Sequence, residues 1–242
     1  MNEKFAASSI RALALVCGIG GLVLFVGFPL GSLGLVRMQW SEADVLWWDG
    51  LLSFAFFLQH SGMVRRQFRT RVYGPIPPCY HRALYSISSG ITLAAVALLW
   101  QRSTNHLLVL GSAFRWVALA LAICAFALFV WGALALRKLD LFGTRAITAH
   151  TQNAADESPV FIVRGPYRWV RHPWYLAAIM LFWSCVDFTS DRFLFNVLWT
   201  GWVYLGTRLE ETDLVRDFGD VYEKYRGRVP MLIPWYCPTA TV

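Results

Sequence analysis

Charged residues are scarce in this chain of 242 residues, of which only 15% are Asp, Glu, Lys or Arg. A soluble domain ordinarily carries about 25%. Charge is absent altogether from Ala12–Val36, a run of 25 residues, and one membrane span needs only about 20. Because 57% of the residues are hydrophobic, this shortage excludes an ordinary soluble domain. We predict an integral membrane protein.

Regularly spaced cysteines are also lacking. The 5 cysteines show neither metal-ligand nor redox spacing, so neither a metal site nor a structural disulfide is predicted. The sequence likewise has no internal repeat, no low-complexity stretch and no sign of a second soluble domain. We therefore expect a single membrane domain over residues 1–242, with an N-terminal four-span bundle at 1–136 and a functional core at 137–242.

Long apolar segments predict an all-α fold with about six transmembrane helices, of which the last two form a short hairpin. The first segment exceeds the core of a cleaved secretory signal, which is about 7–15 residues long, so it is expected to remain as a span. The predicted spans are Ala12–Val36, Val45–Val64, Ala83–Gln101, Trp116–Leu136, Trp174–Phe188 and Phe193–Thr207.

Positive charge is distributed unevenly between these segments. Of the 22 Lys and Arg residues, 18 lie before the first span, between the second and third, between the fourth and fifth, or after the sixth. Positive residues favour the cytoplasmic side, so both termini are predicted to be cytoplasmic in a bacterial inner membrane. The net charge of +7 then reflects topology. No nucleic-acid partner is predicted, and the basic run Arg65–Arg71 is expected to contact anionic membrane lipid.

One connection is much longer than the others. Arg137–Arg171 is polar and 35 residues long, and loops of this length are usually functional or disordered. Its later part, Val160–Val163, reads as an extended segment, and Gly165–Pro166 reads as a turn. We interpret this segment as a cytoplasmic cofactor-binding loop.

The loop ends at a predicted helix start. Pro173 suits the first turn of a helix, and His172 before it is biased towards an extended conformation. The free N–H groups at such a start, together with the helix dipole, favour a carboxylate or a phosphate. Arg171 and His172 would flank that group.

A second polar cluster follows the sixth predicted span. Glu210 and Glu211 lead into an amphipathic helix that is expected to end near Gly227. Its apolar residues recur at helical spacing: Leu214, Phe218, Val221, Tyr222 and Tyr225.

Polar groups beside membrane spans are costly and tend to be functional. A helix start, aromatic rings and a carboxylate together suit a zwitterionic cofactor with an aromatic head. Glu210 would accept hydrogen bonds from an ammonium or from ribose hydroxyls. Phe161, Tyr167 and Tyr175 would cover an adenine or a sulfonium through their ring faces. The alternative interpretation is a structural ion-pair cluster at the level of the headgroups.

The spacing Gly165-x-Tyr167-x-x-x-Arg171-His-Pro-x-Tyr175, an apolar span and Glu210-Glu211 resembles the isoprenylcysteine carboxyl methyltransferase superfamily of membrane methyltransferases. Phe218-Gly219-x-x-Tyr222-x-x-Tyr225 and Val229-Pro230 continue the resemblance. The resemblance implies that the core at 137–242 binds S-adenosyl-L-methionine between the long loop, the fifth span and the C-terminal helix. The cofactor-binding residues that it implies are Gln152, Phe161, Ile162, Val163, Tyr167, His172, Pro173, Tyr175 and Glu210, with Arg171 and Glu211 beside them.

Residues in the N-terminal half indicate which branch of this superfamily the chain resembles. Gln59-His-Ser-Gly-Met-Val-Arg65 is similar to a motif of bacterial methanethiol S-methyltransferases and their NnrU-like relatives. The prenylcysteine enzymes carry an arginine four residues before the first glutamate, where this chain has Gly206 and places Arg208 two residues later. The expected substrate is therefore a small lipophilic thiol, and His60 and Arg208 are the candidate catalytic residues.

Electrostatics also favour methylation of a thiol in a membrane-embedded pocket. Attack of a thiolate on a sulfonium brings opposite charges together, so a water-poor pocket favours the reaction. Alternative functions remain: prenylcysteine carboxyl methylation, phospholipid amine methylation, or a non-enzymatic NnrU-like role in which His60 and His81 approach one haem. No oligomeric state is predicted.

Overall fold

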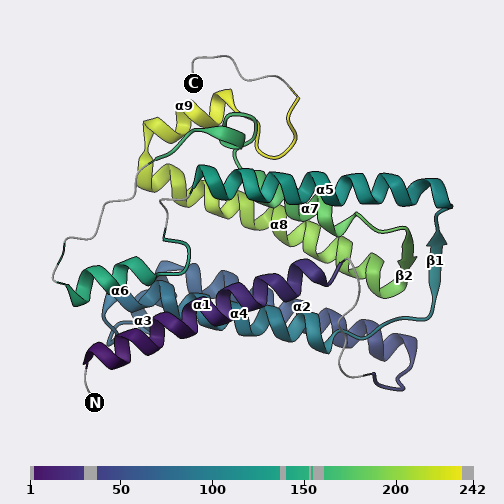
Figure 1. Cartoon of the computed structure of the whole chain (residues 1–242), viewed down its shortest axis with the longest axis horizontal. Helices are drawn as coiled ribbons and strands as arrows, with labels where there is room; N and C mark the ends of the chain where they lie inside the picture. Colours follow the sequence, from purple (N-terminus) through teal and green to yellow (C-terminus); the bar gives the residue numbers. More distant parts are fainter. Residues whose placement is uncertain (1–2, 30–36, 137–139, 153, 155–160, 236–242) are drawn as a thin grey trace. The chain divides into compact units, whose positions relative to one another are not determined.

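The computed structural model describes residues 3–29, 37–136, 140–152, 154 and 161–235. These residues are helical except for loops and two short strands (Figure 1). They pack into two compact units, one formed by residues 1–105 and 139–158 and the other by residues 106–138 and 159–242. The predicted all-α class is confirmed.

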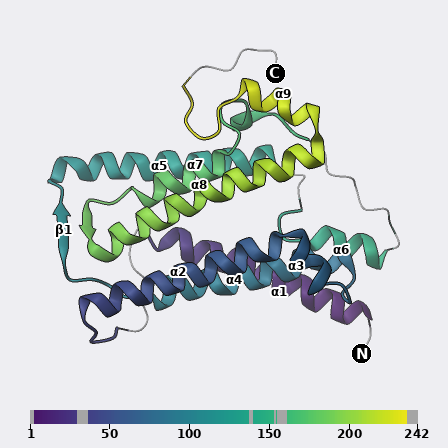
Figure 2. The same ribbon diagram turned by 180° about the vertical axis from the view of Figure 1, so that it is seen from behind.

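The first unit is built on three long helices. These are α1 (Glu3–Gly27), α2 (Glu42–Val64) and α4 (His81–Leu99). The short α3 (Arg66–Arg71) and the 3₁₀ helix η1 (Pro78–Tyr80) lie between α2 and α4, and α6 (Thr144–Thr151), which lies further along the chain, also belongs to this unit. Helix α4 packs against both α1 and α2 (Figure 2). Helix α2 begins at Ser41, whose Oγ accepts a hydrogen bond from the backbone N–H of Asp44 at 3.3 Å, which satisfies one free donor of the first turn.

Small residues let α1 and α4 approach closely. A Cβ atom on Gly90 would lie 2.1 Å from the Cys17 carbonyl oxygen, and one on Gly21 would lie 2.4 Å from the Gly90 carbonyl oxygen. Helices that cross a membrane often associate through such small residues, because van der Waals packing replaces the hydrophobic effect there.

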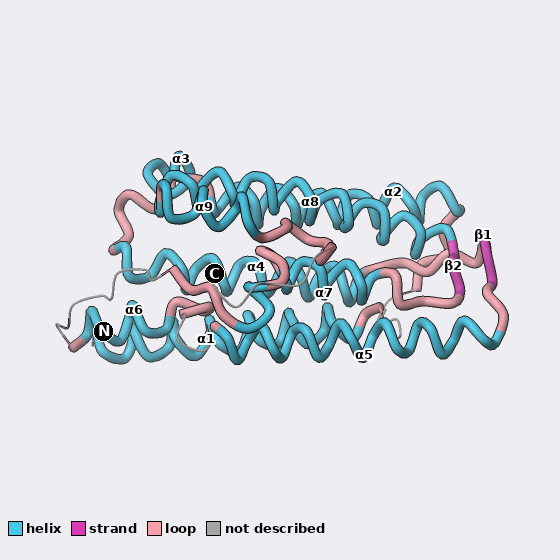
Figure 3. Tube along the Cα trace, turned by 90° about the horizontal axis from the view of Figure 1, so that it is seen from above, coloured by secondary structure: helices cyan, strands magenta, loops and turns pink. Residues whose placement is uncertain are grey.

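The second unit contains β1 (His106–Val109), α5 (Ser112–Ala135), the 3₁₀ helix η2 (Gly165–Arg168), α7 (Pro173–Phe182), β2 (Asp187–Thr189), α8 (Ser190–Phe218) and α9 (Asp220–Arg228). Helix α7 packs against α5 and α8. The two strands, magenta in Figure 3, pair antiparallel with His106 opposite Thr189. This small sheet was not predicted, because three or four residues carry too little periodicity to indicate a strand.

Three helical segments are long and apolar enough to cross a membrane: Lys4–Gly27, Pro78–Leu99 and Ser112–Ala135. They make this a membrane protein by length and composition. Helix α2 covers the second predicted span without being one of the three. The six-span topology and the cytoplasmic position of the long loop stay predictions.

The last two predicted spans differ in length from the observed helices. Helix α7 ends at Phe182, before the predicted end at Phe188, because the chain then turns into β2. Helix α8 runs without a break past Thr207 to Phe218 and ends at Gly219, whose φ is +54°. Glycine adopts a positive φ without steric cost and therefore ends helices readily. The single amphipathic helix predicted after the sixth span is thus divided between α8 and α9.

Candidate functional site

The N-terminus of α7 is tied to the C-terminal segment of the chain. Pro173 occupies the first turn of α7, and His172 before it is non-helical, as predicted. The backbone N–H of Arg171 donates to the Pro230 carbonyl at 2.9 Å, and that of His172 donates to the Met231 carbonyl at 3.2 Å. The predicted turn also forms, as η2, which begins at Gly165 with a φ of +59°.

Arg171 and Glu211 form a buried ion pair beside this helix start. Arg171 Nε donates to Glu211 Oε1 at 2.6 Å, with only 9% and 7% of the two side chains exposed. Arg171 Nη1 also donates to the carbonyl of Arg226 at 2.9 Å and to that of Val229. A cation is favourable at these carbonyls because the C-terminal end of a helix carries partial negative charge. Arg171 therefore joins α7, α8 and α9.

His172 lies between the two glutamates. Its Nε2 is 3.3 Å from Glu211 Oε1, and its Nδ1 is 3.7 Å from Glu210 Oε2. Glu211 is buried, whereas 44% of the Glu210 side chain is exposed. The Glu211 carboxylate is taken up by Arg171, so the more exposed carboxylate of Glu210 is the one that a cationic group could reach.

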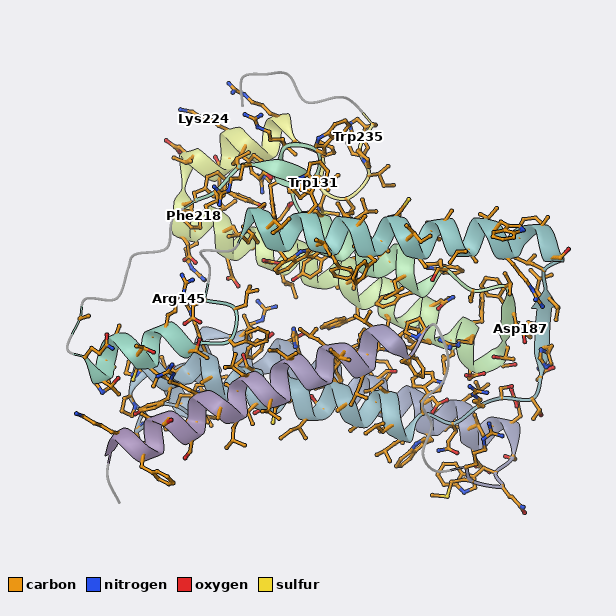
Figure 4. All side chains as sticks on the ribbon, in the orientation of Figure 1. Trp131, Arg145, Asp187, Phe218, Lys224 and Trp235 are labelled. Atoms are coloured by element: carbon orange, nitrogen blue, oxygen red, sulfur yellow. The ribbon has the colours of Figure 1, made fainter. Side chains whose placement is uncertain are left out.

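Aromatic rings form a wall next to these charges. The ring of Phe161 lies 5.3 Å from those of Phe218 and Tyr225 and 5.9 Å from that of Tyr222, measured between centroids. Figure 4 labels Phe218 at the end of α8. The Tyr225 hydroxyl donates to the Tyr167 carbonyl at 2.6 Å. This wall joins the loop before η2 to α8 and α9.

The Tyr222 hydroxyl is an unusual feature of the wall. Only 2% of Tyr222 is exposed, and its oxygen makes no hydrogen bond of ordinary geometry with any residue that the structure describes. Burial raises the pKa of Tyr222, and the negative charge of Glu211 raises it further, while the nearby Arg171 opposes both. The phenol is therefore neutral and lies close to the charged cluster.

The pKa of Glu211 is shifted in the opposite direction, below its ordinary value. Burial alone would raise its pKa, but hydrogen bonds from His172 and Arg171 and their positive charges outweigh burial and lower the pKa from 4.5 to about 2. Because the folded state favours the ionised form of Glu211, this carboxylate adds to the free energy of unfolding only while it is ionised.

The stability of the protein is therefore expected to depend on Glu211 in acid. The contribution is complete above pH 4.5 and is lost as the pH falls towards 2, because the folded-state pKa lies below the ordinary value. The melting temperature of the wild type in detergent should fall across this window. The Glu211→Gln variant, which does not titrate there, should show a flatter profile, and parallel profiles for the two proteins would contradict the assignment.

Most of the predicted cofactor-binding residues come together in the second unit. Arg171, His172, Glu210 and Glu211 make the charged cluster described above. The imidazole of His172 stacks on the ring of Tyr175 with centroids 5.4 Å apart. The remaining members lie within or beside this cluster: Phe161, Ile162, Val163, Tyr167 and Pro173.

Three predicted site residues lie outside this cluster. Gln152 ends α6 and His60 belongs to α2, both in the first unit. The His60 Nε2 is 2.7 Å from the Tyr85 hydroxyl. Arg208 is exposed on α8, and its side chain makes no hydrogen bond or ion pair with a described residue. Val160, within the predicted extended segment, lies outside the described residues.

Sequence reasoning missed the part of Tyr222, Tyr225 and the segment Pro230–Met231 in this site. The signal was present, because the tyrosines and Val229-Pro230 belong to the spacing on which the resemblance rests. The C-terminal helix was expected beside the cofactor, but these residues were interpreted only as its apolar face and the segment after it, because helical spacing does not reveal which side chain meets which partner.

Comparison with known proteins shows that the sequence of this chain is similar to those of several methyltransferases. The methanethiol S-methyltransferase of a Pseudomonas species is 32% identical over 215 residues, which cover 88% of this chain and 82% of that protein. The Mycobacterium tuberculosis protein of the same name is 32% identical over 244 residues, covering 93% and 97%. The protein-S-isoprenylcysteine O-methyltransferase of Xenopus laevis is 29% identical over 89 residues, covering 35% and 30%. No family model and no solved structure matches the chain.

The names of these relatives are all those of methyltransferases. The resemblance inferred from the motifs is therefore confirmed. The chain belongs to the methanethiol S-methyltransferase family, with a more distant relationship to the prenylcysteine enzymes.

Proposed function

We propose that this protein transfers a methyl group from S-adenosyl-L-methionine to a small lipophilic thiol, of which methanethiol is the simplest, to give a methyl thioether. The observation that carries the proposal is the cluster of Arg171, His172, Glu210 and Glu211 beside an aromatic wall. The names of the relatives support both the reaction class and the thiol.

The residues of this cluster fit the cofactor chemically. The accessible carboxylate of Glu210 suits an ammonium or a sulfonium, and the rings of Phe161 and Tyr175 suit an adenine. The buried hydroxyl of Tyr222, which lies near Arg171, offers one further polar contact. Once bound, the cofactor supplies an activated methyl group on a sulfonium.

Each residue has a distinct part in this proposal. Glu210 accepts hydrogen bonds from the cofactor, while Glu211 and Arg171 hold the α7, α8 and α9 termini around it. His172 orients Glu210 through Nδ1. His60 is proposed to accept the proton of the substrate thiol at a neutral imidazole nitrogen, and alignment of the reactants supplies much of the remaining acceleration.

We further propose a six-span topology in a bacterial inner membrane, with both termini and the long loop cytoplasmic. The three long apolar segments support the membrane location, and the uneven distribution of Lys and Arg supports the orientation.

Binding of S-adenosyl-L-methionine tests the proposal directly. Calorimetry on detergent-purified wild type should give saturable binding, and the His172→Ala and Glu210→Ala variants should lose at least about tenfold in affinity, since each loses one interaction with a charged group. Glu223→Ala, which removes an exposed carboxylate from α9, is the matched control and should bind normally. Wild-type protein that is folded but does not bind the cofactor would refute the proposal.

Analysis of the reaction product tests whether the methyl acceptor is a thiol. Wild-type enzyme with cofactor and methanethiol should release dimethyl sulfide, measured in the headspace by gas chromatography. Methylation of a prenylcysteine carboxylate or of a phospholipid amine, without thioether formation, would favour the alternative enzymes. A Soret band in purified protein would favour the haem-binding alternative, for which His60 and His81 already have Nε2 contacts of 2.7 and 2.9 Å with protein oxygens.

A further inference from the structure

A cavity with a volume of about 290 Å³ lies in the first unit, between the first turns of α1 and the C-terminal end of α6. Figures 1 and 2 show these two helix ends side by side. The cavity is at the lower end of the size range of small-ligand sites, so it suits one compact polar group. Its lining residues, none of them acidic, are Lys4, Ala7, Ser8, Arg11, Thr151 and Gln152.

The spacing of the α1 residues explains why two cations meet there. Lys4, Ser8 and Arg11 follow one another at intervals of four and three residues and therefore lie on one face of the helix. Ala7, on the same face, is 2% exposed and packs in a core cluster with Ile147 of α6. This packing turns the face with both cations towards α6.

The positive charge of the cavity is uncompensated. Neither the Lys4 ammonium nor the Arg11 guanidinium makes an ion pair or a hydrogen bond with any residue that the structure describes. Two cations beside one cavity repel each other, and an anion between them would remove that cost. The Ser8 hydroxyl and the Gln152 carboxamide supply neutral hydrogen-bond donors.

The position of the cavity indicates which class of anion it would meet. It lies at the start of Lys4–Gly27, an apolar segment long enough to cross a membrane. The end of such a segment lies at the level of the lipid headgroups, where basic residues meet anionic phosphates.

We propose that this cavity binds a phosphate group, with the Arg11 guanidinium pairing with two phosphate oxygens and the Lys4 ammonium acting as a point charge. The phosphate of an anionic phospholipid and free inorganic phosphate share this chemistry. The cavity shares no residue with the charged cluster of Arg171, His172, Glu210 and Glu211, and phosphate binding is measured without the methyl-transfer reaction.

Binding experiments on the full chain in an uncharged detergent test the proposal. The probes are inorganic phosphate and a short-chain phosphatidylglycerol below its micellar concentration, both titrated by calorimetry at constant ionic strength. The Lys4→Gln and Arg11→Gln variants should each weaken binding about tenfold, which is the effect of one lost charge-assisted hydrogen bond. Lys4→Arg should retain binding. Lys224→Gln, which removes an exposed charge from α9 (Figure 4), should have no effect.

The outcomes separate the two sources of phosphate. Tighter binding of phosphatidylglycerol than of phosphate, weakened in both variants, identifies a lipid headgroup site. Binding of inorganic phosphate alone, with the same dependence on Lys4 and Arg11, identifies a site for a soluble phosphate. Absence of binding of either probe to folded wild type would overturn the proposal, as would equal affinities in the two variants and the Lys224→Gln control.

Discussion

Replacing Glu211 by alanine is expected to destabilise the protein by about 3–5 kcal/mol, the usual cost of removing one partner from a buried ion pair. The variant would leave the Arg171 guanidinium buried without its carboxylate, 2.6 Å away in the wild type. It would also remove the 3.3 Å contact of His172. Because Arg171 joins α7 to α9 through the carbonyls of Arg226 and Val229, the damage should extend to the whole site.

The neighbouring Glu210→Ala substitution should behave differently. Glu210 is 44% exposed and lies 3.7 Å from His172, so its removal should change the free energy of unfolding by less than about 1 kcal/mol. The Glu210→Ala variant should instead show a weaker affinity for S-adenosyl-L-methionine. Unfolding by SDS titration in mixed micelles measures the first quantity, and calorimetry measures the second. Equal destabilisation by the two alanine variants would contradict the burial of Glu211 and the exposure of Glu210.

The second large effect is expected from Gly90→Ala in α4. The added methyl group would lie 2.1 Å from the Cys17 carbonyl oxygen and 2.9 Å from the Gly18 backbone nitrogen. Backbone atoms of α1 cannot rotate away as a side chain would, so the two helices must separate. Overpacking of this kind typically costs about 1–3 kcal/mol and occasionally more. We expect a lower melting temperature and a reduced yield of folded protein.

Gly20→Ala provides the matched control within α1. A Cβ atom on Gly20 would meet no heavy atom within 4 Å, so the same added methyl group causes no clash. Alanine is about 1 kcal/mol more favourable than glycine inside a helix, and the control should be neutral or slightly stabilised. If Gly90→Ala were equally well tolerated, the close approach of α1 and α4 would be disproved.

Much of this protein could be predicted because its signals are local. The uncharged run Ala12–Val36 predicts a membrane helix from composition alone. A span-length apolar helix is present there, although its bounds are Lys4–Gly27 and thus differ from the predicted ones. The start of α7 at Pro173 follows from the fixed φ of proline and its missing N–H. The spacing around Arg171-His172-Pro173 indicated the superfamily before any contact was known, and the relatives confirm it.

The length of α8 could not be predicted in the same way. A membrane span was expected to end at Thr207, where the apolar residues give way to charges. The helix continues to Phe218, since its backbone hydrogen bonds do not depend on the polarity of the side chains, and Gly219, the first glycine after Thr207, ends it with a positive φ. Hydropathy thus indicates where a span leaves the lipid, and it does not indicate where the helix ends.

The sequence by itself determined the class of this protein, its family and the residue types of its candidate site. Only the tertiary structure decided their arrangement. Neighbouring helical positions point about 100° apart, so the packing of α8 alone determines that Glu211 is buried and Glu210 is half exposed. The partners of Arg171 lie 40 residues away in Glu211 and 58 away in Val229. Contacts at such separations form only when the chain closes on itself, and no local pattern of residues encodes them.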